Sequence, residues 1–353
     1  MDYKKKLEEL LDHLISEGGS DLHLCVGRVP TIRVSGFLIP LVNYKTLTKE
    51  DTKAFMELFL NSEDNKTFLT KKEIDFSYDY KNKNRFRGNC YFEQGVIAIA
   101  LRFVPNKIPS LEALNLPPIL ESFVGVHQGF FIVVGPIGHG KSTTLASMID
   151  FINQTRSEHI ITIEDPIEYV YEPKLSIINQ REVGRDSLGF NIALVSTLRE
   201  DANVILVGEM RDSDTMATAV TAAETGHLVF STLHTNNASQ TIDRIIDSFP
   251  PGQQEQVRIQ LAGSLTGIFS QRLIPRVSGG LIPAYELLIK NNAVANMIRE
   301  KRVFEIDTVI ETSLQQGMIS MNRSLADLVR RGEITAENAY LYSLQPKELE
   351  KLI

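Results

Sequence analysis

Hydrophobic positions in the first third of the chain form short runs, preceded by one stretch with helical spacing. That spacing predicts an amphipathic helix that ends at Gly18-Gly19 and whose apolar face holds Leu7, Leu10, Leu11, Leu14 and Ile15. Short runs bounded by turn residues predict five strands, at 20–26, 31–34, 74–80, 85–92 and 96–103. The segment 48–60 predicts a second helix, with Thr48 as its candidate N-cap. We therefore expect a small α+β domain over residues 1–104.

The pattern changes after a segment that contains two prolines, Pro105 and Pro109, and that predicts a linker at 105–110. From residue 111 the apolar runs are continuous, as in parallel strands that are covered on both faces. These runs fall at 130–134, 160–163, 204–207 and 228–231, and helical stretches such as 142–153 and 214–225 lie between them. A further apolar run at 281–289 precedes a helical, charged C-terminal region. We expect an α/β domain over 111–353, built on a parallel sheet covered by helices.

Composition narrows the class of protein. Of the 353 residues, 43% are hydrophobic and 23% charged, which is ordinary for a globular protein and excludes disordered, collagen-like and coiled-coil chains. The formal net charge of −7 opposes a nucleic-acid partner. Cys25 and Cys90 are far apart, which argues against a disulfide framework or a cysteine zinc site and fits reduced, cytoplasmic thiols. No run approaches the ~18 apolar residues of a membrane span, so we expect no transmembrane segment.

The motif with the most specific chemistry is G-x-x-x-x-G-K-[ST]. It consists of Gly135, Pro136, Ile137, Gly138, His139, Gly140, Lys141 and Ser142, and is followed by Thr143. The motif follows an apolar strand and opens a helix, which is the context that a phosphate-binding P-loop requires. Its glycines let backbone N–H groups turn toward phosphates, and the helix N-terminus adds a favourable dipole. We expect Lys141 to reach the β- and γ-phosphates of ATP and Ser142 to hold Mg²⁺.

Acidic residues follow two other predicted strands. Glu209 comes shortly after 204–207, in the place of a Walker B acid, where it would hold Mg²⁺ through water or polarise the attacking water. Three carboxylates, among them Glu164 and Glu168, follow 160–163, and acids paired at a strand end suit metal binding or water activation. Taken alone, Glu209 also fits an ordinary acid at a strand end, and the carboxylates after 160–163 also fit a solvated turn.

Two histidines, His227 and His234, stand near the two ends of the strand predicted at 228–231. His234 lies toward the C-terminal tip, where a sensor of the γ-phosphate would be placed. A lone histidine is more often a core or surface residue, but in this setting we expect a functional role for both.

Long segments of the chain resemble the secretion/traffic ATPase superfamily of P-loop NTPases, and within it the pilus-retraction branch. They are ITIEDPIE at 161–168, NQREVGRD at 179–186, LREDANVILVGEMRD at 198–212 and TAAETGHLVFSTLHT at 221–235. The resemblance implies a RecA-like ATPase domain joined to a PAS-like N-terminal domain and assembled as a homohexamer. It implies that Glu168 is the general base, with Glu164 as a candidate partner, and that Glu209 positions Mg²⁺. It also implies that N-terminal arginines reach the phosphates as the ring closes, namely Arg85, Arg87 and Arg102.

The function implied by this resemblance is an ATP-hydrolysing motor that powers the retraction of type IV pili, and so twitching motility. Such a motor is cytoplasmic and peripheral at the inner face of the cell membrane, where it works against the platform protein of the pilus base. One alternative is a pilus-extension or type II secretion ATPase, but these commonly carry a four-cysteine zinc motif and a longer N-terminal region, which the sequence lacks.

Proteins of two different classes also carry P-loops. A non-hydrolysing regulatory ring subunit is opposed by the intact set of Lys141, Glu168, Glu209 and His234, and a DNA-translocating motor is opposed by the acidic balance.

The sequence departs from the family pattern at a few positions. Ile137 and His139 stand where the P-loop usually has threonine and serine, and Val195 and Ala295 stand where retraction ATPases often carry arginine. Neither P-loop position must be glycine, so the phosphate cradle should survive, whereas Ala295 bears on the retraction role.

Overall fold

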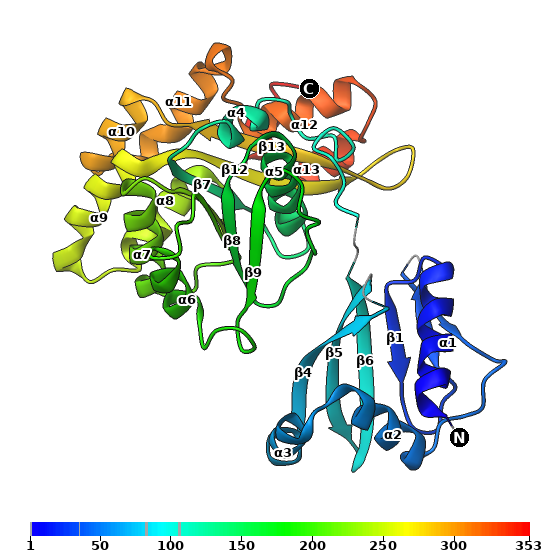
Figure 1. The fold of residues 1–353 in the computed structure, drawn as a ribbon. Coiled ribbons are helices and arrows are strands. Elements are labelled where there is room, and N and C mark those ends of the chain that lie inside the picture. Colours follow the sequence, from blue (N-terminus) through cyan, green and yellow to red (C-terminus); the bar gives the residue numbers. More distant parts are fainter. Residues whose placement is uncertain (1, 35, 82–83, 105–106) are drawn as a thin grey trace. The chain divides into compact units, whose positions relative to one another are not determined.

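The protein consists of two compact units, Met1–Lys107 and Ile108–Ile353, in a computed structural model (Figure 1). The structure describes residues 2–34, 36–81, 84–104 and 107–353. The division falls inside the segment 105–110 that was expected to be a linker, and residues 105 and 106 of that segment lie outside the described residues.

The first unit is a six-stranded antiparallel sheet in the order β3-β2-β1-β6-β5-β4. Its strands are β1 (Asp21–Leu24), β2 (Thr31–Val34), β3 (Phe37–Pro40), β4 (Glu73–Tyr80), β5 (Asn84–Glu93) and β6 (Val96–Val104). Its helices are α1 (Tyr3–Ser16), α2 (Lys49–Phe59) and α3 (Ser62–Lys71). All three helices pack on one sheet face, because one core contains their apolar residues together with those of that face.

The sequence predicted most of this unit. Thr48 caps α2 as expected, in a reciprocal capping box with Asp51. Two elements were missed, β3 and α3. All four side chains of β3 are exposed on an edge strand, so no alternation marks it, and the apolar positions of α3 include only one buried residue, Phe68.

The second unit is built on a seven-stranded sheet in the order β13-β12-β7-β11-β10-β8-β9. Its strands are β7 (Gly129–Val134), β8 (His159–Glu164), β9 (Ile177–Glu182), β10 (Val204–Val207), β11 (Leu228–Leu233), β12 (Leu265–Pro275) and β13 (Leu281–Ile289). Strands β12, β7, β11, β10, β8 and β9 are parallel, as expected, and β13 adds an antiparallel strand at the β12 edge. Gly279 and Gly280, both with positive φ, allow the tight return between these two strands.

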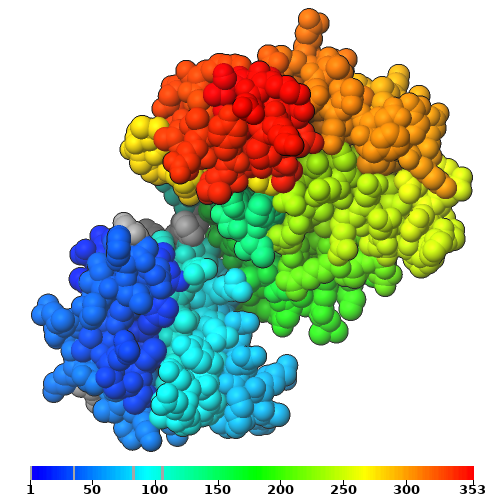
Figure 2. Space-filling model, turned by 180° about the vertical axis from the view of Figure 1, so that it is seen from behind, coloured from blue at the N-terminus to red at the C-terminus, as the bar shows by residue number. Residues whose placement is uncertain are grey.

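Helices cover both faces of this sheet, and alternate residues of β7 enter the two cores. The helices are α4 (Leu120–Val124), α5 (Lys141–Thr155), α6 (Phe190–Thr197), α7 (Ser213–Glu224), α8 (Ala238–Asp247), α9 (Pro251–Ser264), α10 (Asn292–Arg299), α11 (Ile306–Thr312), α12 (Met321–Arg330), α13 (Ala336–Tyr342) and α14 (Pro346–Leu349). Helices α4 and α5 pack on one face, and α6 to α11 on the other. Figure 2 shows the last helices, in red, gathered at the surface of this unit, where α12 to α14 share a smaller core with β12 and β13. The expected fold class is confirmed.

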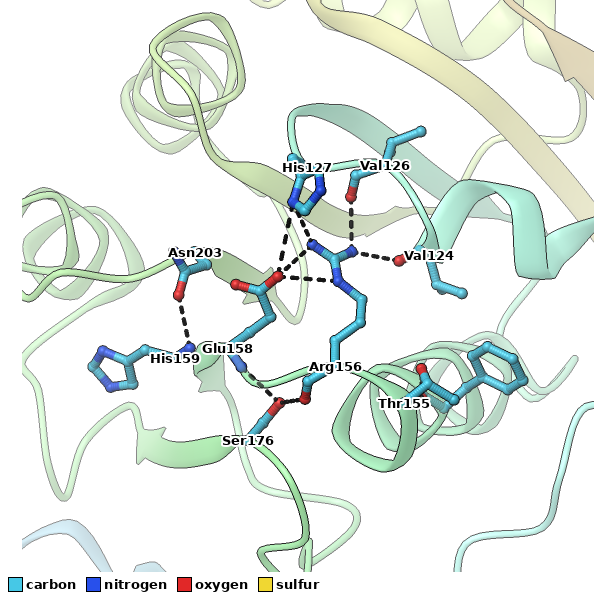
Figure 3. Close-up of polar contacts among 10 residues, drawn as sticks. Val124, Val126, His127, Thr155, Arg156, Glu158, His159, Ser176 and Asn203 are labelled. Carbon is cyan, nitrogen blue, oxygen red and sulfur yellow. Dashed lines mark hydrogen bonds and ion pairs between the residues drawn. The ribbon is translucent and has the colours of Figure 1, made fainter.

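A cluster of polar contacts around Arg156 closes the end of the sheet at which the parallel strands begin (Figure 3). The guanidinium group donates to the backbone oxygens of Val124 and Val126 and forms an ion pair with Glu158. Ser176 Oγ donates to the backbone oxygen of Arg156 and accepts from the amide of Glu158. These bonds join the end of α4 and the residues after it to the segment between α5 and β8.

Among the residues that the structure describes, no helix is long and apolar enough to cross a membrane.

Candidate nucleotide-binding and catalytic site

A cavity of about 400 Å³ opens where the parallel strands of the second unit end. Ligands of open α/β sheets bind at this edge, because the loops after the strands converge there. The P-loop follows β7, and the other walls come from the segments after β8, β10 and β11. The predicted site residues that line the cavity are Ile137, Gly138, Gly140, Lys141, Ser142, Thr143, Glu164, Glu168, Glu209 and His234.

The P-loop adopts a backbone that needs glycine at defined positions. Gly138 and Gly140 have φ of +79° and +78°, in the left-handed region that side chains disfavour. A Cβ on Gly135 would lie 2.3 Å from the backbone oxygen of Gln271, which is closer than any side chain permits. Helix α5 begins at Lys141 with no side chain capping its first turn, so its N-terminal dipole faces the cavity without a competing protein group.

Lys141 is held by its own loop. Its side chain is only 7% exposed, and Nζ donates to the backbone oxygens of Gly135, at 2.8 Å, and Pro136, at 2.9 Å. Burial lowers the pKa of the ammonium group to about 8, and the carboxylates of Glu168 and Glu209 act in the opposite direction. Among the described residues no carboxylate forms an ion pair with Lys141, so a phosphate group would give this buried cation a direct anionic partner.

Three predicted P-loop residues do not line the cavity, but they form contacts that stabilise the loop. Gly135 and Pro136 supply the carbonyl groups that bind Lys141. His139 Nδ1 accepts from the backbone amide of Leu273 at 2.9 Å, and its ring lies against that of Tyr342. The histidine that departs from the family pattern therefore contacts β12 and α13, and the cradle of glycines keeps its form.

Glu164 and Glu168 differ in their surroundings, although Glu164 is the last residue of β8 and Glu168 lies only four residues later. Glu164 is 8% exposed; Oε1 accepts from Thr162 Oγ1 at 2.6 Å and from Gln180 Nε2 at 3.3 Å. Its Oε2 accepts from the amide of Glu168 at 3.4 Å. Burial raises the pKa of Glu164 to about 7, against the effect of these hydrogen bonds. The Glu168 carboxylate is exposed at the cavity, so it is the acid that can meet water.

Glu209 is the centre of a charged group at the ends of β10 and β11. It forms an ion pair with Arg211, which also lies 3.5 Å from Asp165, and its Oε2 is 3.7 Å from His234 Nε2. On the other side of its ring, His234 Nδ1 lies 3.2 Å from Lys141 Nζ. Burial lowers the pKa of His234, and the Lys141 charge acts in the same direction. His234 therefore connects the P-loop lysine to the strand-end acid.

The other four predicted residues are not among those that line this cavity. His227 lies before β11, at the opposite end of that strand from His234, where its amide donates to the backbone oxygen of Ala222. Arg85, Arg87 and Arg102 belong to the first unit, on β5 and β6. Roles for these four residues in nucleotide chemistry stay predictions.

Sequence reasoning assigned no role to Arg211 and Tyr169. Arg211 follows Glu209 by two residues, and this spacing was the signal for a charge partner. Tyr169 follows Glu168 directly, lines the cavity, and its hydroxyl lies 2.9 Å from Thr143 Oγ1, which joins the acidic loop to α5. Nothing in the sequence pattern indicated this second contact, because it depends on how the loop after β8 returns over the P-loop.

The burial of Glu164 predicts a pH dependence of stability. An unfolded glutamate titrates near 4.5 and the folded one near 7, so between these pH values the folded protein binds more protons. The contribution of Glu164 to the free energy of unfolding therefore falls as pH rises through this window. We expect Glu164→Gln to gain stability relative to the wild type as pH rises from 5 to 7, measured by denaturant unfolding without nucleotide. The exposed Glu255→Gln is the control and should follow the wild type; a Glu164→Gln curve parallel to it contradicts the assignment.

Comparisons with known proteins agree with this site. A family model described as type II/IV secretion system protein matches residues 102–328. The type IV pilus retraction ATPase PilT of Pseudomonas aeruginosa is 43% identical over 333 residues, which cover 94% of this chain and 96% of that protein. The twitching motility protein of Neisseria gonorrhoeae is 45% identical over 311 residues, covering 88% and 83% of the two chains. The crystal structure of the pilus retraction motor PilT with bound ADP matches with a TM-score of 0.92, 47% identity and coverage of 98% of both chains.

The similarity therefore extends over both units and includes the P-loop, the acidic segments and the histidine segment. With these motifs gathered around one cavity, the chain belongs to the type II/IV secretion system protein family and is an ATPase.

Proposed function

We propose that this ATPase is the motor that retracts type IV pili and thereby drives twitching motility. The observation that carries the proposal is the cavity that holds Lys141, Glu168, Glu209 and His234, in a chain similar along nearly its whole length to pilus retraction ATPases. The alternative of a pilus-extension or type II secretion ATPase is less well supported, because the two cysteines of the chain cannot form a four-cysteine zinc motif. A non-hydrolysing ring subunit has no need for such a set of groups around one cavity.

Each group of the cavity takes a role that its surroundings suit. Lys141 and the N-terminus of α5 bind the phosphates of ATP. Ser142 and Glu209 would hold Mg²⁺, which would neutralise negative charge on the phosphates. The small cradle around Gly138 and Gly140, open to the cavity, fits a phosphate chain. Glu168 takes a proton from the attacking water, and His234 senses the γ-phosphate.

Glu168 suits the role of general base better than Glu164 does. Both oxygens of Glu164 already accept hydrogen bonds from the protein, one of them from the amide of Glu168, so Glu164 orients the loop that carries the base. A pKa near neutrality would by itself suit a general base, so the two acids must be compared directly.

Glu168→Gln keeps the size of the side chain and removes the base. We expect the purified variant to bind ATP normally and to hydrolyse it at least ~10²-fold more slowly, the usual scale for the loss of a general base. Glu164→Gln should lose less activity, because glutamine retains an oxygen acceptor for the Glu168 amide. Phosphate release and nucleotide binding are measured on both variants. Near-normal turnover of Glu168→Gln, together with an inactive Glu164→Gln, would transfer the role to Glu164.

The arginines of the first unit complete the proposed cycle in a homohexamer. Arg102 and Arg33 flank Asp21 in register across β6, β1 and β2, and Arg87 stands opposite Arg102 on β5. Arg102 Nε donates to Asp21 at 2.9 Å, yet the Arg102 side chain is 68% exposed. An exposed arginine on a separate unit can approach the phosphates as the ring closes, so that charge stabilisation is coupled to domain position.

Arg102→Ala should lower the rate of ATP hydrolysis more than the affinity for ATP, since the arginine acts on charge that develops during the reaction. Arg33→Ala is the matched control, because it also removes a cationic neighbour of Asp21, at 3.7 Å, on the same sheet face. Both rate and affinity are measured on purified protein. Equal losses in the two variants would indicate that Asp21 and the sheet are disturbed rather than the reaction, and an unchanged Arg102→Ala would remove this residue from the mechanism.

The motor is proposed to act in the cytoplasm, peripheral to the inner face of the cell membrane, on the platform protein of the pilus base. Deletion of the gene tests the function in cells. We expect excess surface pili and loss of twitching motility, both restored by the wild-type gene and neither by Lys141→Ala. Loss of pili would instead indicate an extension ATPase, and unchanged piliation and motility would contradict the proposal.

A further inference from the structure

Strand β12 lies beside the two loops that bring Lys141 and His234 together. It runs parallel to β7, with Ser270 opposite Val134, the last residue of β7. Residues 271–273 therefore continue past the end of β7, level with the start of the P-loop. Successive side chains of a strand point to opposite faces, so the side chain of Gln271 leaves on one face and those of Ser270 and Arg272 on the other.

On the first face, Gln271 is bound to the P-loop through both ends of its amide. Its Oε1 accepts from Thr144 Oγ1 at 2.7 Å, and its Nε2 donates to the backbone oxygen of His139 at 2.8 Å. The side chain is 2% exposed, so water cannot replace either bond. The amide of Leu273 adds the bond to the His139 ring, at 2.9 Å. Three hydrogen bonds thus tie β12 to the loop and the helix that present Lys141.

On the second face, the same strand is bound to the loop that follows His234. Ser270 Oγ donates to the backbone oxygen of Asn236 at 2.8 Å, and Arg272 Nη2 lies 3.4 Å from Asn236 Oδ1. Arg272 is 8% exposed, and its Nη1 donates to the backbone oxygen of Tyr342 at 2.6 Å, which gives the guanidinium group a second partner. Asn236 follows His234 by two residues, so these contacts hold the loop that comes directly after the histidine.

The P-loop and the loop after β11 lie outside the hydrogen-bonded strands of the sheet, whereas β12 is one of those strands. It pairs with β7 as far as Ser270, and on its other edge it pairs with β13 from Gly267 to Pro275, so the ladder with β13 continues through residues 271–273. A site is defined most sharply when its loops are bonded to such a regular element. The contact that joins the two loops is the 3.2 Å approach of Lys141 Nζ to His234 Nδ1.

We propose that Gln271 and Ser270, on opposite faces of β12, are positioning residues that set the P-loop and the loop after β11 relative to one another. Gln271 fixes the phosphate cradle, and Ser270, assisted by Arg272, fixes the histidine that faces it. Neither side chain lines the cavity. The two residues therefore act through different groups: loss of Gln271 loosens nucleotide binding, and loss of Ser270 slows turnover at unchanged binding. This inference rests on the ATPase activity of the chain and not on pilus retraction.

The test measures the dissociation constant for a fluorescent ADP and kcat for ATP on full-length protein. Gln271→Met keeps the length of the side chain and removes both hydrogen bonds, so we expect about tenfold weaker ADP binding, the scale of one to two net hydrogen bonds. Ser270→Ala should leave ADP binding within about twofold and lower kcat about fivefold. Thr266→Val is the control: it removes a 2.9 Å bond to the backbone oxygen of Phe130 at the far end of the same strand, and should change neither quantity.

A second variant keeps the test open if Gln271→Met does not fold. Thr144→Val removes one of the same hydrogen bonds from the α5 side and should by itself weaken ADP binding. Where Gln271→Met does fold, the effects of the two substitutions should be less than additive in the double variant. Separate effects, on binding for Gln271 and on kcat for Ser270, support the proposal. Equal losses of binding and kcat in both variants, or the same losses in Thr266→Val, would show that β12 has only a structural role and would overturn it.

Discussion

The rest of the site depends on the hydrogen bonds that hold the buried ammonium group of Lys141. A cation that is 7% exposed has lost most of its hydration, and it is kept in place by two carbonyl oxygens of its own loop. Those carbonyls can turn inward only because the loop passes through conformations that glycine adopts without strain, and because Gly135 leaves room for Gln271. Among the described residues, no carboxylate forms an ion pair with Lys141. Its charge is therefore left for a phosphate.

The same cavity shows how burial gives different tasks to two nearby glutamates, Glu164 at the end of β8 and Glu168 in the loop that follows it. Glu164 is enclosed and its oxygens are occupied by Thr162, Gln180 and the amide of Glu168, which makes it part of the framework, and its burial raises its pKa. Glu168 lies in the loop after β8 and faces the cavity. Gln180 also donates to the backbone oxygen of Tyr169, at 2.7 Å, so β9 supports the loop on both sides of Glu168. Glu164, which is buried, thus orients the loop that carries Glu168, which can meet water.

The sequence predicted what depends on neighbouring residues and missed what depends on distant ones. The continuous apolar runs located β7, β8, β10 and β11, and the P-loop motif located the phosphate cradle, because their signals lie within a few residues. Strand β12 was not predicted from the sequence, for two reasons. The strand continues directly from α9, and its apolar run is broken by polar residues, namely Thr266, Ser270, Gln271 and Arg272. Those polar residues are buried or partly buried, and most of their partners stand far away in the chain. Residues that support a site from a neighbouring strand carry no local signal, so only the fold shows them.

The resemblance to a family assigned Arg102 a task that the structure makes physically reasonable. In the first unit this arginine is bound to Asp21, a carboxylate that is almost fully buried and needs a cationic partner. If Arg102 were the only such partner, its departure toward a phosphate would leave a buried charge uncompensated and cost several kcal/mol. Arg33 stands on the other side of Asp21 in the next strand, and Ser20 Oγ donates to the same carboxylate at 2.7 Å. Asp21 therefore keeps partners when Arg102 leaves. Arg102 itself is 68% exposed, so water screens its side of the pair and a phosphate group in an anion-binding site can compete for this arginine.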